Sequence, residues 1–221
     1  MQKKGRERKI EMLKRYNNES YVAIYDQRYR SDQFRKINDL FSYINLKSEN
    51  FVFSGNILDF GTGTGLYWDF LNQSLDELEI FEKNEIRFLA LDLALAMLDE
   101  LQNKTKTNKG ENTLALHTHL ICGDGENLPF RDEFCSHCFA FTSLQNLADV
   151  KRGLTEIKRC LKKTPKKTLV GISYLKKKIE KNELLKMLRN NLGVPHLVEK
   201  KYDNFKHEKT EDYILFVEVD Y

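Results

Sequence analysis

Three glycines alternate with other residues directly after an apolar segment, Ile57 to Phe60, and give the run Gly61-Thr62-Gly63-Thr64-Gly65. Glycine lacks a Cβ atom, so it lets a chain reverse tightly and lets its backbone approach a ligand. The apolar residues before the run predict a buried strand, and Leu66 to Leu71 predict a helix after it. The chain is therefore expected to contain a strand, turn and helix that bind a nucleotide-like ligand.

The residues around the glycines restrict the kind of ligand. The dinucleotide fingerprint is not matched, because Leu66 falls where its third glycine should be, and no Gly-Lys-Ser/Thr follows as in a phosphate-binding loop. Asp59 instead places a carboxylate at the end of the strand. This charge repels phosphates and attracts an amine, so the pattern favours a ligand that carries an ammonium group.

Two further acids follow two further predicted strands. Arg87 to Leu91 is followed by Asp92, and Leu120 to Cys122 is followed by Asp124. Taken singly, an acid in such a place often only caps a helix. Three acids after three successive strands favour a common site, because open α/β sheets bind ligands at the carboxyl ends of their strands.

The order of these motifs resembles the class I S-adenosylmethionine-dependent methyltransferases, in the broad group that includes the quinone-biosynthesis enzymes. The resemblance covers roughly residues 56–174 and includes the segment Gly123-Asp124-Gly125-Glu126-Asn127-Leu128-Pro129-Phe130. It implies S-adenosylmethionine as cofactor, with the ribose held by Asp92 and the adenine amino group by Asp124. The cofactor-binding residues expected on this basis are Asp59, Gly61, Thr62, Gly63, Gly65, Asp92, Leu93, Asp124, Gly125 and Tyr29.

The rest of the chain predicts one α/β domain: a Rossmann-like, seven-stranded, mostly parallel sheet with helices on both faces and a C-terminal antiparallel strand pair. Further strands are expected over residues 134–141, 168–174, 197–205 and 213–219, further helices over 150–161 and 180–192, and an exposed polar loop over 103–112. Residues 51–221 form the methyltransferase domain in this interpretation. Residues 1–50 form an N-terminal helical segment of the same domain, with a helix expected over 32–43.

Tyr21, Tyr25 and Tyr29 recur every four residues in this N-terminal segment, which would place their rings on one face of a helix. Two interpretations stay open. The rings either pack against the body of the domain or, as in related small methyltransferases, belong to a lid that folds over the cofactor, with Tyr29 favoured over Tyr25 as the contact.

The acceptor side is expected in the loop after the fourth strand, at Ser143, Gln145 and Asn146, although the two amides could instead cap the next helix. The Asn/Asp-Pro-Pro-Tyr/Phe signature of amide and base-nitrogen methylation is absent. No clear general base is present, so the catalytic residues are unknown. Cys135 also stands where the family usually has Asp, which leaves the retention of turnover open.

The cysteines Cys122, Cys135, Cys138 and Cys160 are expected to be small core residues. Cys135 and Cys138 form Cys-x-x-Cys, but residues three apart on a strand point to opposite faces, so no metal is predicted.

Charge and hydropathy suggest where the protein works and what it contacts. No apolar run is long enough to cross a bilayer and no secretory signal precedes the domain, so a soluble, cytoplasmic enzyme of the EC 2.1.1 type is expected. The net charge of +3 arises from residues 1–15, with seven Lys/Arg and two Glu. A small-molecule acceptor is favoured. The alternatives are RNA held by the basic N-terminus, a small activating partner protein, and a cofactor-binding subunit without turnover.

Overall fold

The computed structural model describes residues 2–47, 52–74, 81–107, 118–163, 168–198 and 211–221. Its central element is a seven-stranded sheet with the strand order β3-β2-β1-β4-β5-β7-β6. The strands are β1 (Phe53–Phe60), β2 (Phe81–Asp92), β3 (Thr118–Cys122), β4 (His137–Phe141), β5 (Leu169–Leu175), β6 (Gly193–Leu197) and β7 (Asp212–Val219).

The first five strands are parallel, and β7 pairs antiparallel with both β5 and β6. The sheet therefore confirms the predicted architecture, including the C-terminal antiparallel pair. Strand order reverses beside β1, so the carboxyl ends of β1, β2 and β4 meet at the place where such sheets form ligand crevices.

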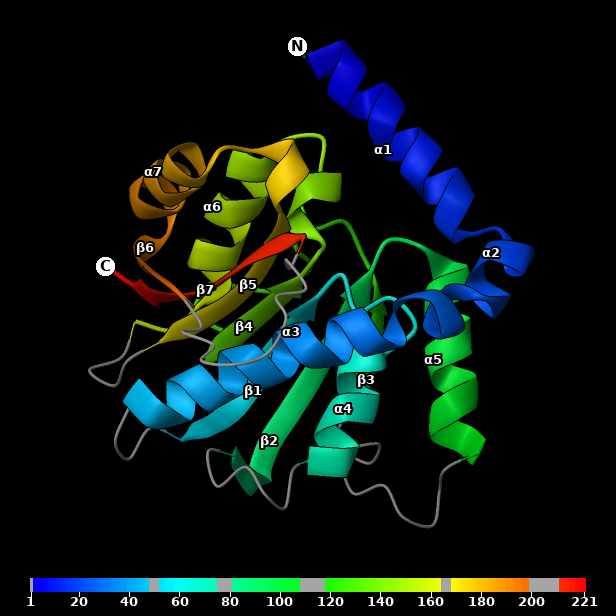
Figure 1. The fold of residues 1–221 in the computed structure, drawn as a ribbon, viewed down its shortest axis with the longest axis horizontal. Helices are drawn as coiled ribbons and strands as arrows, with labels where there is room; N and C mark the ends of the chain where they lie inside the picture. Colours follow the sequence, from blue (N-terminus) through cyan, green and yellow to red (C-terminus); the bar gives the residue numbers. More distant parts are fainter. Residues whose placement is uncertain (1, 48–51, 75–80, 108–117, 164–167, 199–210) are drawn as a thin grey trace, which may run out of the picture.

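Helices cover both faces of the sheet (Figure 1). They are α1 (Gln2–Tyr16), α2 (Glu19–Ala23), α3 (Tyr25–Lys47), α4 (Leu66–Ser74), α5 (Leu95–Thr107), α6 (Val150–Cys160) and α7 (Lys181–Asn191), with short 3-10 turns η2 (Leu144–Asn146) and η3 (Lys176–Lys178). Side chains of α3 and α4 share one buried cluster with β1 and β2, and side chains of α6 and α7 share another on the opposite face.

Alternation of side chains along β1 explains this layering. Ile57 faces the α3 and α4 cluster, whereas Leu58 and Phe60 face the α6 and α7 cluster. Both faces of the strand are apolar, as expected for a parallel strand that is covered on both sides.

The structure corrects several predicted boundaries. α3 is longer than the expected helix over 32–43, and α5 continues to Thr107 into the predicted polar loop, whose residues 108–112 lie outside the described residues. The strand predicted over 197–205 is instead β6, which ends at Leu197, and residues 199–205 again lie outside the described part. The sequence did not predict β6 because Gly193 and Pro195 are residue types that disfavour strands.

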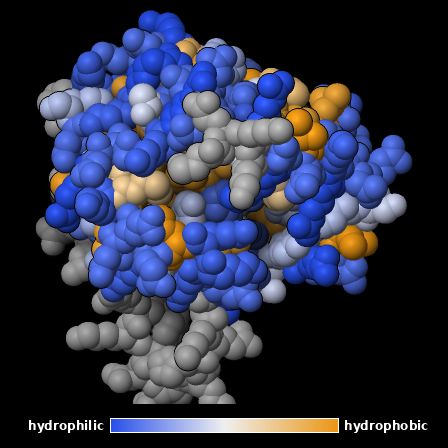
Figure 2. Space-filling view, turned by 90° about the horizontal axis from the view of Figure 1, so that it is seen from above, coloured by the Kyte–Doolittle hydropathy of each residue, from blue (hydrophilic) through white to orange (hydrophobic). Residues whose placement is uncertain are grey.

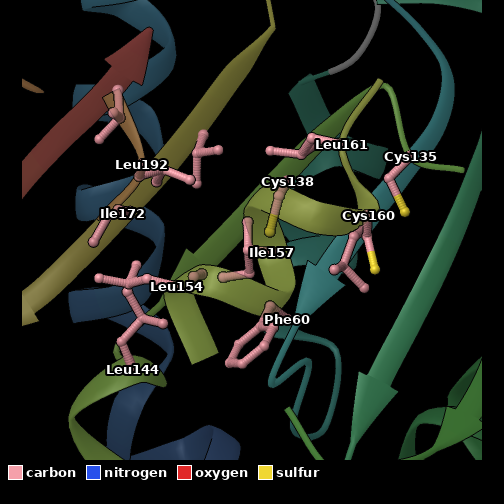
Figure 3. Close-up of a cluster of buried hydrophobic side chains, with 14 of the residues drawn as sticks. Phe60, Cys135, Cys138, Leu144, Leu154, Ile157, Cys160, Leu161, Ile172 and Leu192 are labelled. Carbon is pink, nitrogen blue, oxygen red and sulfur yellow. The ribbon is translucent and has the colours of Figure 1, made fainter. Parts of the chain in front are cut away.

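The cysteine prediction was right in outcome for three residues and wrong in its reasoning. β4 begins only at His137, so Cys135 and Cys138 are not on one strand, and both lie with Cys160 in the α6 and α7 cluster (Figure 3). All three are buried free thiols, whereas Cys122 is exposed, contrary to the expectation. Within the described residues no group of metal-ligating side chains is present.

The surface seen from above is mostly hydrophilic, with hydrophobic groups in small separate spots (Figure 2). None of the helices in the described ranges has the length and apolar character needed to span a bilayer.

Candidate functional site

A pocket opens at the carboxyl ends of β1, β2, β3 and β4. Glycine-loop residues Gly61 and Gly63 form one side, and segments that follow β2, β3 and β4 supply most of the remainder. α1 adds Lys9, Met12, Leu13 and Tyr16 from the N-terminal segment. A smaller adjoining pocket shares Tyr25, Gly61, Gly63 and Phe141 with it and reaches Asp59 and Thr62.

The glycine loop turns as its sequence predicts. Gly61 has φ +75° and Gly63 has φ +58°, conformations that residues with a Cβ rarely adopt. A Cβ on Gly61 would lie 2.5 Å from Cβ of Ser143, whereas a Cβ on Gly63 would meet nothing within 4 Å. Gly61 is therefore required for close packing, and Gly63 leaves open space at the pocket.

Asp59 is the most deeply buried of the three predicted acids, with 2% of its surface exposed. Burial, together with the nearby charge of Asp92, raises its pKa to about 7, against the effect of hydrogen bonds from Thr62 and Trp68. Among the described residues, no partner donates a hydrogen bond to its Oδ2 atom. A buried carboxylate oxygen without a donor is costly, so this atom is suited to a cationic donor from a ligand.

Asp92 is fixed by the backbone. Its Oδ2 accepts a hydrogen bond from the amide of Gly63 at 2.9 Å and its Oδ1 accepts one from the amide of Ala94 at 2.8 Å. Burial nevertheless raises its pKa. Each carboxylate oxygen has a further lone pair, so this side chain can still accept hydrogen bonds from ligand hydroxyls.

Asp124 differs from the other two because it already has a cation. Nζ of Lys9 lies 2.6 Å from its Oδ1 and 3.4 Å from a carboxylate oxygen of Glu126. Partial burial acts to raise the pKa of Asp124, but the Lys9 bond and the Glu126 amide outweigh it and the pKa is lowered. The basic N-terminus thus reaches into the pocket.

The tyrosines of the N-terminal segment form one ring cluster from two helices. Tyr21 lies in α2, and Tyr25 and Tyr29 lie in α3, with ring centroids 5.9 Å apart for Tyr21 and Tyr25 and 4.8 Å apart for Tyr25 and Tyr29. Tyr25 lines both pockets. Tyr29 lines neither pocket. Its ring packs against that of Tyr25, and its hydroxyl lies 3.2 Å from that of Tyr21.

Two of the three predicted acceptor residues line the main pocket, and the third does not. Ser143 and Asn146 line the main pocket, and the buried Ser143 Oγ has no hydrogen-bond partner among the described residues. Gln145 is buried instead and donates a 2.6 Å hydrogen bond to the carbonyl of Thr142. Neither amide caps α6, since Asp149 accepts from the amide of Arg152 there.

The structure brings most of the predicted cofactor residues together. Asp59, Gly61, Thr62, Gly63, Asp92, Leu93, Asp124 and Gly125 line one or both pockets. The other two predicted residues, Gly65 and Tyr29, lie outside both linings, and Gly65 faces Leu101 on α5. The sequence did not predict that Lys9, Met12, Tyr16 and Phe141 line the pocket, although the apolar residues Ile10, Met12 and Leu13 among the basic ones are a signal that α1 has an apolar face.

Comparison with known proteins agrees with this geometry. Residues 58–164 match the family model described as "Methyltransferase domain". Residues 58–164 form a methyltransferase domain. The assignment confirms the family predicted from the glycine and acid motifs, and S-adenosylmethionine as its cofactor class.

One curated relative is malonyl-[acyl-carrier protein] O-methyltransferase from Marinomonas sp. (strain MWYL1), 34% identical over 90 residues. The match covers 40% of this chain and 27% of that protein, so the chain spans about a quarter of the relative's length.

Solved structures share the fold at low sequence identity. Magnesium protoporphyrin IX methyltransferase from Synechocystis PCC 6803, with bound S-adenosylmethionine, has a TM-score of 0.67 at 11% identity over 96% of this chain and 97% of that chain. A methyltransferase from Aquifex aeolicus has a TM-score of 0.58 at 17% identity, covering 91% and 97%. A chain in the complex of the Trm112 methyltransferase activator with a methyltransferase from Haloferax volcanii has a TM-score of 0.60 at 14% identity, covering 92% and 97%.

Proposed function

We propose that this protein is an S-adenosylmethionine-dependent methyltransferase of the EC 2.1.1 type with a small-molecule acceptor. The observation that carries the proposal is Oδ2 of Asp59, which has no donor among the described residues and is buried beside the glycine loop, in a small pocket that adjoins the one lined by two further acids. The amino acid end of the cofactor carries an ammonium group, which supplies the missing donor.

The three acids would bind three different parts of the cofactor. Asp59 would hold the ammonium, Asp92 the ribose hydroxyls and Asp124, with Gly125, the adenine end. Leu93 and the apolar side chains of α1 would contact the adenine ring, since Met12 and Leu13 line the same pocket. Tyr25 would close the methionine end, with Tyr29 supporting it through their ring contact.

Bound cofactor supplies an activated methyl group that an acceptor removes by in-line displacement. The work of the chain is to align acceptor and methyl and to exclude water, which contributes to rate through orientation. Ser143 and Asn146 are placed to hold the acceptor.

Asp59 has a pKa of about 7, which would suit a base, but it is assigned here to the cofactor ammonium, and the histidine and phenols considered as bases are poor ones. His137 lies at the amino end of β4 and outside both pocket linings, burial lowers its pKa to about 4, and its Nδ1 accepts a hydrogen bond from the amide of Leu169. Burial raises the pKa of Tyr16 and Tyr25, so both phenols keep their protons at neutral pH. Positioning of an acceptor that is already nucleophilic is therefore the favoured mode of catalysis.

The small-molecule acceptor is favoured over RNA for two reasons. The relatives named above include enzymes named for a malonyl-carrier and a protoporphyrin substrate. Part of the basic N-terminus is also engaged inside the protein, because Lys9 pairs with Asp124 and the guanidinium of Arg15 lies 4.4 Å from the ring centre of Tyr21.

Two measurements test the proposal in sequence. Calorimetry with S-adenosylmethionine should show one binding site per chain. Incubation with methyl-labelled cofactor and fractionated cell extract should then transfer label to the small-molecule pool, and an Asp59→Asn variant should transfer none above background. Label in RNA would select the RNA alternative, and binding without transfer would indicate a non-catalytic subunit or a missing activator protein. Absence of binding would refute the proposal.

A further inference from the structure

Thr142 has a backbone conformation that its side chain disfavours. It follows β4 directly, lines the main pocket and has φ +51°. Of the residues in the described ranges, only Thr142 and Glu133 combine a side chain with positive φ. A β-branched residue is an outlier there, and such strain persists only where the surroundings fix it.

Hydrogen bonds fix both peptide groups of Thr142. Its amide donates to the carbonyl of Ser173 at 3.1 Å and to the Ser173 hydroxyl at 2.9 Å. Its carbonyl accepts from Gln145 Nε2 at 2.6 Å and from Asn146 Nδ2 at 3.4 Å. β5 and η2 therefore hold the residue from two sides.

The hydroxyl of Thr142 lies at the centre of a polar group in the core. Its Oγ1 is 3.0 Å from Ser173 Oγ, 3.2 Å from Asp212 Oδ2 and 3.4 Å from Lys36 Nζ. Gln33 Nε2 donates to it at 3.3 Å. The group joins α3, β5 and β7 at one residue of the pocket wall.

An ion pair forms the buried part of this group. Lys36 Nζ lies 2.5 Å from Asp212 Oδ2, and the two side chains are 2% and 0% exposed. Lys36 also pairs with Asp32 on its own helix. A buried ion pair contributes little net stability compared with apolar residues, and its better-attested effect is to specify one arrangement.

We infer that Lys36 and Asp212, through the hydroxyl of Thr142, are positioning residues that set the cofactor pocket wall. The wall consists of Phe141, Ser143 and Asn146, which lie on either side of the strained residue and line the pocket. A relaxed φ at Thr142 would turn these side chains away from their present places. This inference rests on the proposed function, because it concerns affinity for S-adenosylmethionine.

The decisive variant is Thr142→Gly, with binding of S-adenosylmethionine measured by calorimetry and stability by thermal melting. Glycine adopts positive φ without strain, which offsets the lost hydroxyl bonds, so the melting temperature should stay close to that of the wild type. The wall loses the hydroxyl contacts that link Thr142 to α3, β5 and β7. Affinity should therefore fall about tenfold, because binding must then order a looser wall at a cost in entropy.

Three variants separate positioning from simple packing. Thr142→Ser keeps the hydroxyl and should keep affinity within about twofold, since a lost methyl group removes no anchor. Glu133→Gly makes the same backbone change in an exposed turn outside both pocket linings and should leave affinity unchanged. Lys36→Met should lower affinity at least as much as Thr142→Gly, with a lower melting temperature because Asp212 loses its cation.

The outcomes distinguish this inference from the proposed function. A wild-type chain that does not bind S-adenosylmethionine refutes both. Wild-type binding with unchanged affinity in Thr142→Gly overturns the inference alone. Equal losses in Thr142→Ser and Thr142→Gly, in parallel with lower melting temperatures, would show a packing role and would also overturn it.

Discussion

The two ends of the pocket carry the same functional group in opposite electrostatic states. At the glycine-loop end, Asp59 is buried with its pKa raised to about 7, and one of its oxygens has no donor among the described residues. At the α1 end, the Asp124 side chain is 38% exposed, its pKa is lowered, and Lys9 supplies its counter-charge. One end needs a cation from a ligand, and the other has one from the chain.

This contrast follows from which part of the chain builds each end. Asp59 is surrounded by the sheet and by residues Gly61 to Trp68, a segment with no basic residue. Asp124 lies beside α1, the most basic part of the sequence. Ligand binding should therefore change the protonation of Asp59 at the glycine-loop end and the contacts of α1 with Asp124 at the other end.

The largest expected effect is on the pH dependence of stability. Asp59 keeps its proton in the folded state up to about pH 7, whereas it loses the proton near pH 4 when unfolded. The contribution of Asp59 to the free energy of unfolding is therefore fully present below about pH 4. It is lost as the pH rises through about 7, and the loss reaches about 4 kcal/mol. The raised pKa of Asp92 acts in the same direction.

Chemical denaturation of wild type and Asp59→Asn across this pH range measures the effect. The wild type should lose stability relative to the variant as pH rises, and saturating S-adenosylmethionine should reduce the loss. A constant difference between the two proteins would show that Asp59 is not a protonated buried acid.

The next effect is on cofactor affinity. Asp59→Asn should weaken binding of S-adenosylmethionine about a hundredfold at pH 8, or about 3 kcal/mol, because the bound ammonium loses a buried counter-charge. Asp124→Asn is the matched change at the other end, where the acid is half-exposed and already paired. It should cost only a few-fold, and equal losses measured by calorimetry would remove the contrast between the two ends.

Gly61→Ala should destabilise the protein by about 2 to 3 kcal/mol, because positive φ and a 2.5 Å approach to Ser143 act together. Gly63→Ala is its control. It has positive φ but open space, so about 1 kcal/mol is expected. Urea unfolding measures both, and a larger loss in Gly63→Ala would contradict the assigned packing.

The smallest effect is expected at Lys9. Lys9→Met keeps the aliphatic stem and removes the ion pair with Asp124, which should change unfolding free energy by less than about 1 kcal/mol. Affinity for S-adenosylmethionine should rise about threefold, because Asp124 no longer has to release Lys9 before it binds the adenine amino group. Weaker binding in calorimetry would instead place Lys9 in the bound site.

The strands and acids at the carboxyl edge were predictable because local patterns encode them. Asp59, Asp92 and Asp124 each follow a short apolar run, and parallel strands bring such positions to one edge whatever the details of packing. The place of Tyr25 in the pocket lining was less predictable than the acids. A four-residue spacing of tyrosines identifies a helical face but does not show which ring meets the pocket.

Sequence by itself therefore determined the class of fold, the glycine turn and the acids that mark the cofactor site. The tertiary structure alone decided that Lys9 meets Asp124, that Cys160 shares one cluster with Cys135 and Cys138, and that Lys36, Asp212 and Thr142 form one polar group. The physical reason is distance along the chain. Turns and strands depend on neighbouring residues, whereas these contacts join residues from 22 to 176 positions apart and exist only after the helices have packed on the sheet.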